Sequence, residues 1–230
     1  MNHSATIVVD DNIELFADNP QARCPVALVL DTSGSMQGAA ITELQQAVRM
    51  FYKEIARDPL ASLRVSPSVF TFGGRVVQAV PFSQKMVAPT DAPGQLVAEG
   101  DTPLGAAIRA AIQTIKEQVQ LYRQHAIPNY RPWVILMSDG HPTDDWQQAA
   151  AELKELSANG WTVLCIALGA HADLPALAAC STIEPRRIGT LEFAPFFRWL
   201  SASLKAESRS ATSSRQPVGL PASLGSVVAN

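Results

Sequence analysis

The chain has 230 residues, of which 47% are hydrophobic and 17% are charged, and its formal net charge is -3. This composition is typical of a globular protein and excludes an intrinsically disordered one. The small negative charge gives no electrostatic reason to expect binding to nucleic acid or to an anionic membrane, and no apolar run reaches the roughly 18 residues that a membrane span needs.

The start of the chain and its cysteines bear on the cellular compartment. No basic stretch followed by an apolar core occurs at the N-terminus, so we expect no signal peptide. Cys24, Cys165 and Cys180 are odd in number and widely spaced, which fits neither a disulfide framework nor a zinc site. We therefore expect a cytoplasmic protein in which Cys165 belongs to the hydrophobic core.

Residues 1–24 are interpreted as an N-terminal extension with a strand at residues 5–9. A central strand follows, because residues 26–30 form an unbroken apolar run of the kind that is buried on both faces of a parallel sheet. This run stops at Asp31, and Ser33 and Ser35 come next at alternate positions. Ligands of open parallel sheets bind beyond the carboxyl ends of the strands, so these three side chains lie at a predicted functional edge.

The later elements are predicted from the spacing of apolar residues and from turn signals. In chain order they are a helix at residues 39–57, a hairpin of strands at 64–72 and 76–82, a helix at 102–124, a strand at 133–138, a helix that begins near 144, a strand at 161–168, a short helix at 174–179, a short strand at 187–189 and a closing helix at 193–204. Residues 206–230, rich in Ser, Ala, Pro and Gly, are predicted to be a flexible tail behind one domain of residues 25–205.

Two helix starts carry local signals. Thr102-Pro103 fits an N-cap followed by the first helical residue. Asp144, with Gln147 three residues later, is interpreted as the capping box of the next helix. A second ion or a partner at Asp144 and Asp145 is the alternative to capping.

The alternation of strands and helices predicts an α/β fold with a doubly wound, mostly parallel sheet and an antiparallel edge. Asp139, which ends the second apolar strand, and Thr102 then reach the edge that carries Asp31, Ser33 and Ser35. Two carboxylates and three hydroxyls are hard oxygen donors suited to Mg²⁺, Mn²⁺ or Ca²⁺, of which we favour Mg²⁺. With only two formal negative charges around it, such an ion could take a carboxylate from a partner as a further ligand.

These five positions resemble the metal-ion-dependent adhesion site of von Willebrand factor A domains. The resemblance rests on Asp31-Thr32-Ser33-Gly34-Ser35, then Thr102, then Asp139-Gly140. It implies a mostly parallel six-stranded sheet flanked by helices, with one antiparallel edge strand. It also implies direct metal contacts from the three hydroxyls, and contacts from the two carboxylates either directly or through water.

A narrower resemblance concerns residues 139–146, which read Asp-Gly-His-Pro-Thr-Asp-Asp-Trp. This segment is similar to one in the bacterial TerY-type proteins, which are linked to tellurium resistance and stress. Some members of that group are associated with a PP2C-like phosphatase and a protein kinase. The resemblance therefore implies those two partners, a signalling role and phosphorylation of this chain as a further mode of regulation.

Other interpretations of the same residues compete with a binding module that is not an enzyme. Ser33 and Ser35 could be caps in an ordinary strand-to-helix turn. Asp31 could be the nucleophile of a metal-dependent phosphohydrolase, although Ser33 stands where dehalogenase-type phosphatases have a second Asp. A hydrolase triad of Ser35, His141 and Asp139 lacks the expected nucleophile elbow.

Overall fold

The structure, a computed structural model, describes residue 16 and residues 19–212. Within this part, six strands form one sheet in the order β3-β2-β1-β4-β5-β6, and the predicted strand at residues 5–9 lies outside the described residues. All neighbouring strands are parallel except β3, which runs antiparallel to β2 at one edge, so the predicted fold class is confirmed. The strands are β1 (Cys24–Asp31), β2 (Val65–Gly73), β3 (Arg75–Val80), β4 (Trp133–Ser138), β5 (Thr162–Leu168) and β6 (Arg186–Ile188).

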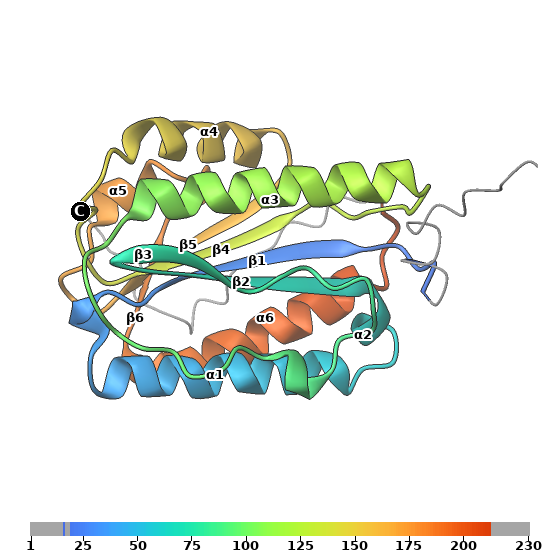
Figure 1. The fold of residues 1–230 in the computed structure, drawn as a ribbon, viewed down its shortest axis with the longest axis horizontal. Coiled ribbons are helices and arrows are strands. Elements are labelled where there is room, and N and C mark those ends of the chain that lie inside the picture. The colour runs from blue at the N-terminus through green and yellow to red at the C-terminus, as the bar shows by residue number, and fades with distance from the viewer. Residues whose placement is uncertain (1–15, 17–18, 213–230) are drawn as a thin grey trace, which may run out of the picture.

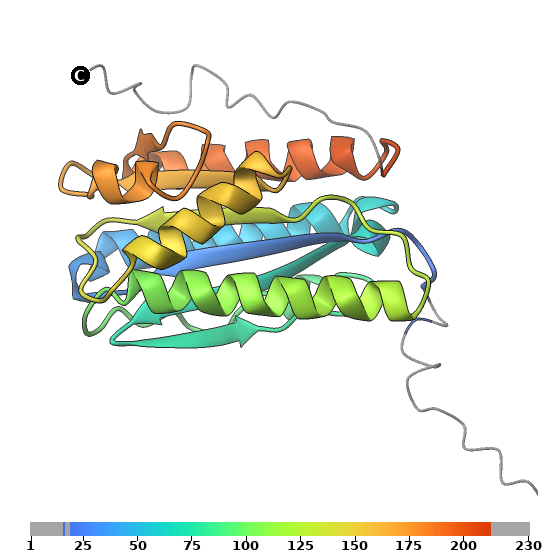
Figure 2. The ribbon, with the colours of Figure 1, turned by 90° about the horizontal axis from the view of Figure 1, so that it is seen from above.

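Helices cover both faces of this sheet. Figure 1 shows α3, α4 and α5 on one face and α1, α2 and α6 on the other, and Figure 2 shows β3 at the outer edge. The α-helices are α1 (Ala39–Ala56), α2 (Ala61–Arg64), α3 (Leu104–Gln124), α4 (Gln147–Ala158), α5 (Leu174–Ala178) and α6 (Phe193–Glu207). The 3₁₀ helices are η2 (Gly34–Met36), η3 (Pro89–Asp91) and η4 (Thr190–Glu192).

Burial on both faces explains why β1 is an unbroken apolar run. Val26, Leu28 and Leu30 pack into the cluster beneath α1 and α6, whereas Ala27 and Val29 pack into the cluster beneath α3 and α4. Successive side chains of a strand point to opposite faces, so a strand covered on both faces needs apolar residues at every position. The three cysteines are free and buried, and Cys165 lies in the core as predicted.

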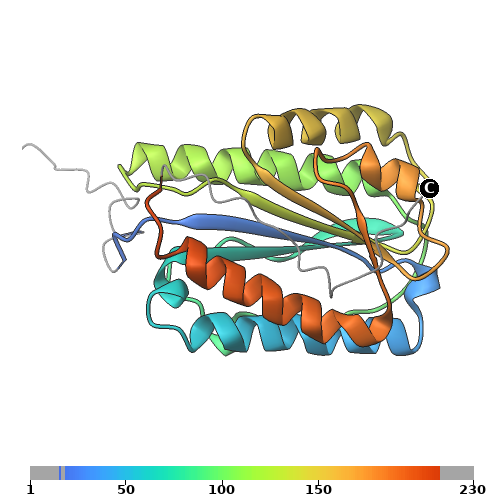
Figure 3. The same ribbon diagram turned by 180° about the vertical axis from the view of Figure 1, so that it is seen from behind.

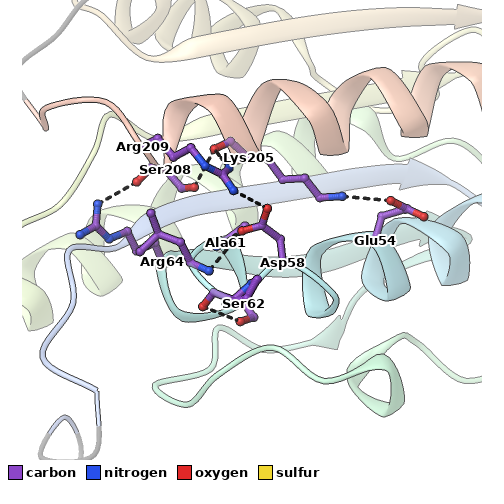
Figure 4. A network of polar contacts seen from close by, with 10 residues as sticks. Glu54, Asp58, Ala61, Ser62, Arg64, Lys205, Ser208 and Arg209 are labelled. Carbon is purple, nitrogen blue, oxygen red and sulfur yellow. Dashed lines mark hydrogen bonds and ion pairs between the residues drawn. The ribbon is translucent and has the colours of Figure 1, made fainter.

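The last helix, α6, ends at Glu207, past the predicted domain boundary at 205. Figure 3 shows this helix lying along α1. Beyond its end, the carbonyl oxygen of Ser208 accepts hydrogen bonds from Arg64 (2.8 Å) and from the Tyr130 hydroxyl (3.0 Å). Figure 4 shows the neighbouring ion pairs, in which Lys205 meets Glu54 and Arg209 meets Asp58. These contacts join the end of α6 to α1 and to the short helix α2, which sequence patterning did not predict.

No helix in the described part of the chain combines the length and the apolar character that a membrane crossing requires.

Candidate metal centre

The predicted functional edge lies where the parallel strands end, at the left of Figure 1. Strands β1 and β4 are direct neighbours in the sheet, and Leu30 pairs with Met137. Asp31 and Asp139 therefore leave the sheet beside each other, although 108 positions separate them in the numbering. The turn η2 brings Ser33 and Ser35 to the same edge, and Thr102 comes from the segment that leads into α3.

Hydrogen bonds connect four of the five predicted ligands. The Asp31 Oδ1 atom accepts from the Ser33 N–H at 2.9 Å, and the Ser33 and Ser35 hydroxyl oxygens lie 2.9 Å apart. The Ser35 hydroxyl donates in turn to Asp139 Oδ1 at 2.7 Å. These oxygens thus form one cluster at the end of the sheet.

The fifth predicted ligand, Thr102, has its hydroxyl close to Gly140. A Cβ atom built on Gly140 would lie 3.3 Å from the Thr102 hydroxyl oxygen and 3.8 Å from that of Ser35. Both hydroxyls therefore border the space that the missing side chain of Gly140 leaves. The structure brings all five predicted residues together.

Burial of the two carboxylates bears on whether a cation fits. Asp31 has no exposed surface, and burial raises its pKa, while hydrogen bonds from Ser138 and Ser33 oppose the rise. Burial also raises the pKa of Asp139, against the hydrogen bond from Ser35. A nearby cation favours the ionised form of both groups and offsets their desolvation. The donor set and its electrostatics therefore fit a hard divalent cation.

Hydroxyls are essential to this set. Among the described residues, no group of three or more His, Cys, Asp or Glu side chains is arranged to hold a metal ion. The described residues therefore contain no cluster of the kind that a softer metal such as zinc prefers, with sulfur and nitrogen ligands.

Sequence reasoning missed the part played by Ser138. Its hydroxyl donates to Asp31 Oδ2 at 2.5 Å, so both carboxylate oxygens of Asp31 accept hydrogen bonds from the protein. The signal was present in the sequence, because Ser138 is the one polar residue of β4 and stands directly before Asp139. Ser138 holds the Asp31 carboxylate in one orientation.

The predicted capping of both helices was wrong. Helix α3 begins at Leu104 with Pro103 as its N-cap residue, and Thr102 makes no capping hydrogen bond. The Asp144 carboxylate instead accepts from the N–H groups of Gly105 (2.9 Å) and Ala106 (2.8 Å). An anionic oxygen is favoured there because the first N–H groups of a helix have no partner within the helix.

Helix α4 consequently lacks the predicted capping box. Its N-cap residue is Trp146, whose side chain makes no capping hydrogen bond. The loop before α4 crosses the start of α3, where the Thr102 N–H donates to the Thr143 hydroxyl at 3.1 Å and the Thr143 N–H donates to the Thr102 carbonyl at 3.0 Å. The segments that carry Thr102 and Asp139 are therefore joined directly.

The hydrolase triad is not assembled. The Ser35 hydroxyl bonds to Ser33 and Asp139, whereas His141 Nδ1 lies 2.9 Å from the carboxylate of Asp173. His141 is largely exposed and links the loop after β4 to the loop after β5. It therefore has no hydrogen bond through which to activate Ser35.

Comparison with known proteins supports the architecture. The sequence model of the von Willebrand factor type A domain family matches residues 26–188. A comparison with curated protein sequences found no match.

Solved structures of the same fold come from diverse organisms. The vWF domain of the type V pili tip protein Mfa5 from Porphyromonas gingivalis aligns with a TM-score of 0.63 and 11% identity, over 83% of this chain and 98% of that one. Manganese-loaded TRAP protein from Plasmodium vivax aligns with a TM-score of 0.54 and 17% identity, over 75% and 71%.

Proximal thread matrix protein 1 from the mussel byssus, with a zinc-occupied MIDAS motif, aligns with a TM-score of 0.56 and 19% identity, over 81% of this chain and 48% of that one. The chain thus spans about half the length of the mussel protein. Identities this low establish the shared fold alone.

Proposed function

The chain belongs to the von Willebrand factor type A domain family, and we propose that it is a binding module, not an enzyme, whose divalent cation captures an acidic side chain of a partner protein. The observation that carries this proposal is the cluster of five oxygen donors with only two formal negative charges. Its members are Asp31, Ser33, Ser35, Thr102 and Asp139.

The protein's own side chains prepare this site for a carboxylate from outside. Ser138 and the Ser33 N–H hold both oxygens of Asp31, so little rearrangement is needed when an ion enters. Ser35 is exposed and Asp139 is partly exposed, which leaves the cluster open toward solvent. When bound, the cation would supply a Lewis acid whose charge of +2 the two carboxylates only balance, so that a further carboxylate meets no excess of negative charge at the ion.

We propose Mg²⁺ as the resident ion. Carboxylate oxygens and uncharged hydroxyl oxygens suit a hard cation, and Mg²⁺ is commonly held by one or two carboxylates together with water. The zinc-occupied MIDAS motif of the mussel protein supports divalent binding at this position in the fold, and the manganese-loaded Plasmodium protein supports divalent binding by a protein of the same fold. Both ions serve as competitors in a titration.

The alternative, a metal-dependent phosphohydrolase that uses Asp31, has less support. A nucleophile must reach its substrate, whereas Asp31 has no exposed surface and both of its carboxylate oxygens accept hydrogen bonds. Hydrolysis of generic phosphoesters with Mg²⁺, lost in Asp31→Asn, would favour the enzyme over the binding module.

The similarity of residues 139–146 to the TerY-type segment supports a role in a bacterial tellurium-resistance or kinase/phosphatase signalling system, in the cytoplasm. The partners would be a PP2C-like phosphatase and a protein kinase. Phosphopeptide mapping after co-expression with such a kinase tests this context, and a chain that stays unmodified and unbound would count against it.

The metal site itself is tested by calorimetric titration with Mg²⁺ and Mn²⁺. We expect binding by the wild type and its loss in Asp139→Asn, which removes one charge and keeps the shape of the side chain. Asp101→Asn is the matched control, because Asp101 is exposed and adjoins Thr102 but stands outside the cluster. Equal binding by wild type and Asp139→Asn would remove Asp139 from the site.

A further inference from the structure

A pocket of about 260 Å³ adjoins the five-residue cluster. Ser35 and Asp139 form one of its walls, so the pocket and the proposed ion position share two residues. The other lining residues come from η2, α1, the end of β5 and the loop after it, η4 and the start of α6; they are Met36, Ala40, Leu168, Gly169, Ala170, His171, Thr190 and Phe193. A ligand held at the cation would therefore have this pocket directly beside it.

The pocket has an apolar interior. Met36, Leu168 and Phe193 are all buried and belong to the core cluster beneath α1 and α6, so the pocket opens onto the top of the hydrophobic core. Leu191, which follows the lining residue Thr190 on η4, is 86% exposed, the highest value among the large hydrophobic side chains of the described residues.

The two sides of the metal cluster differ in charge. On the side of α3, Glu99, Asp101 and Asp145 are exposed carboxylates. The backbone there abuts the cluster, because the Gly34 N–H donates to the Gly100 carbonyl at 2.9 Å. An acidic partner segment is repelled from this side.

Apart from the proposed ligand Asp139, the lining of the pocket includes no Asp or Glu. His171 is exposed, and Arg187 donates a hydrogen bond to the Gly169 carbonyl. Two carboxylates near this side, Asp173 and Glu192, lie outside the lining and accept hydrogen bonds from the N–H groups of Ala176 (2.9 Å) and Gly189 (2.7 Å). An acidic residue held at the proposed cation therefore meets no further carboxylate in the lining of the pocket, whereas the α3 side presents three exposed ones.

We propose that the partner presents an acidic residue to the cation and places a neighbouring bulky apolar side chain, such as Leu, in this pocket. The inference rests on the proposed function and adds the chemical class of the recognised segment. The chain's own C-terminal segment does not meet this description, because residues 208–230 contain no Asp or Glu. The occupant is thus a partner protein with an acidic residue next to an apolar one.

The test uses NMR titration of the isotopically labelled full chain in Mg²⁺ with two blocked peptides, Gly-Leu-Glu-Leu-Gly and Gly-Ala-Glu-Ala-Gly. Both peptides should shift the amide signals of Ser35 and Gly140, and only in the presence of Mg²⁺. The Leu peptide alone should shift Gly169, Ala170 and Thr190, and it should bind about fivefold more tightly because it buries more apolar area.

A pair of variants makes the test specific to the pocket. Ala40→Leu fills the pocket from α1 without altering any of the five proposed ligands, and Ala39→Leu makes the same change at an exposed neighbour outside the pocket. We expect Ala40→Leu to abolish the preference for the Leu peptide and Ala39→Leu to retain it.

The outcomes separate the two proposals. Shifts at Ser35 and Gly140 with equal affinity for both peptides would overturn the pocket and leave the metal site standing. An absence of Mg²⁺-dependent shifts with either peptide would overturn the capture of acidic residues and the pocket together.

Discussion

Asp144 accepts a hydrogen bond from the N–H of Gly105, a residue 39 positions earlier in the chain, at 2.9 Å. This contact ties the loop after Asp139 to the helix after Thr102. The approach is close, because a Cβ atom on Gly105 would lie 2.4 Å from the carbonyl oxygen of Asp145. Two of the proposed metal ligands are thus held relative to each other by a contact that involves neither of them.

We expect Asp144→Ala to weaken metal binding as well as the fold. Removing a capping carboxylate costs about 1 kcal/mol of unfolding free energy, and loss of a residue that orients metal ligands lowers affinity about 10-fold. Thermal unfolding and calorimetric titration with Mg²⁺ measure the two effects separately.

Asp58→Ala is the matched control for this prediction. Asp58 accepts from the N–H groups of Leu60 (3.1 Å) and Ala61 (2.9 Å), where it serves α2 at the opposite end of the sheet from the metal cluster. It should lower stability by a similar amount and leave Mg²⁺ affinity unchanged. Equal loss of affinity in both variants would show that Asp144 acts only through global stability.

Gly140→Ala should reduce metal binding without unfolding the protein. The added methyl group would occupy the space between the hydroxyls of Thr102 and Ser35, at 3.3 and 3.8 Å from their oxygens. Gly94→Ala is the control, since a Cβ atom there meets nothing within 4 Å. We expect an unfolding temperature close to that of the wild type for both variants, and a lower Mg²⁺ affinity for Gly140→Ala alone; unchanged affinity would place the ion elsewhere.

Asp31→Asn should abolish metal binding while the metal-free fold keeps its stability. The amide can accept from the Ser33 N–H and donate to the Ser138 hydroxyl, and it removes a charge that is fully buried. Asp31→Ala leaves both of those groups without partners and should cost about 1–3 kcal/mol. Chemical denaturation in a chelator compares the three proteins. A metal-free Asp31→Asn that is as unstable as Asp31→Ala would contradict this account.

Acid should weaken the junction between α2 and the end of α6. Burial alone would raise the pKa of Asp58, but hydrogen bonds from the Ala61 N–H, Arg209 and the Leu60 N–H outweigh it and hold the pKa below its usual value. Because the folded-state pKa is lowered, the charge of Asp58 contributes stability that is complete above the unfolded pKa of about 3.9. That contribution is lost as the pH falls through the folded value.

Asp58→Asn isolates this contribution, since Asn can still cap α2 but cannot pair with Arg209. The unfolding temperature of the wild type should exceed that of Asp58→Asn by a constant amount between about pH 5 and 7, and the difference should shrink below about pH 4. A difference that stays constant to about pH 3 would show that the Asp58 charge does not contribute.

The sequence by itself determined the strands and the chemistry at their ends. Unbroken apolar runs specify β1 and β4 because both faces of a parallel sheet are covered, and the polar residues that stop those runs must gather at one edge. For this reason the order of residues along the chain is enough to place Asp31, Ser33, Ser35 and Asp139 together. The five ligands remain a prediction that awaits a metal titration.

Only the tertiary structure decided which groups support that cluster. A capping pattern in the sequence identifies a carboxylate but not the helix that it caps. Packing places the loop that contains Asp144 against the start of α3, so Asp144 caps α3 and not α4, the helix that follows it in the chain. The bond from Ser138 to Asp31 and the pocket beside Asp139 likewise depend on segments far apart in the chain. Local patterns encode the elements, whereas contacts between elements follow from how the whole chain packs.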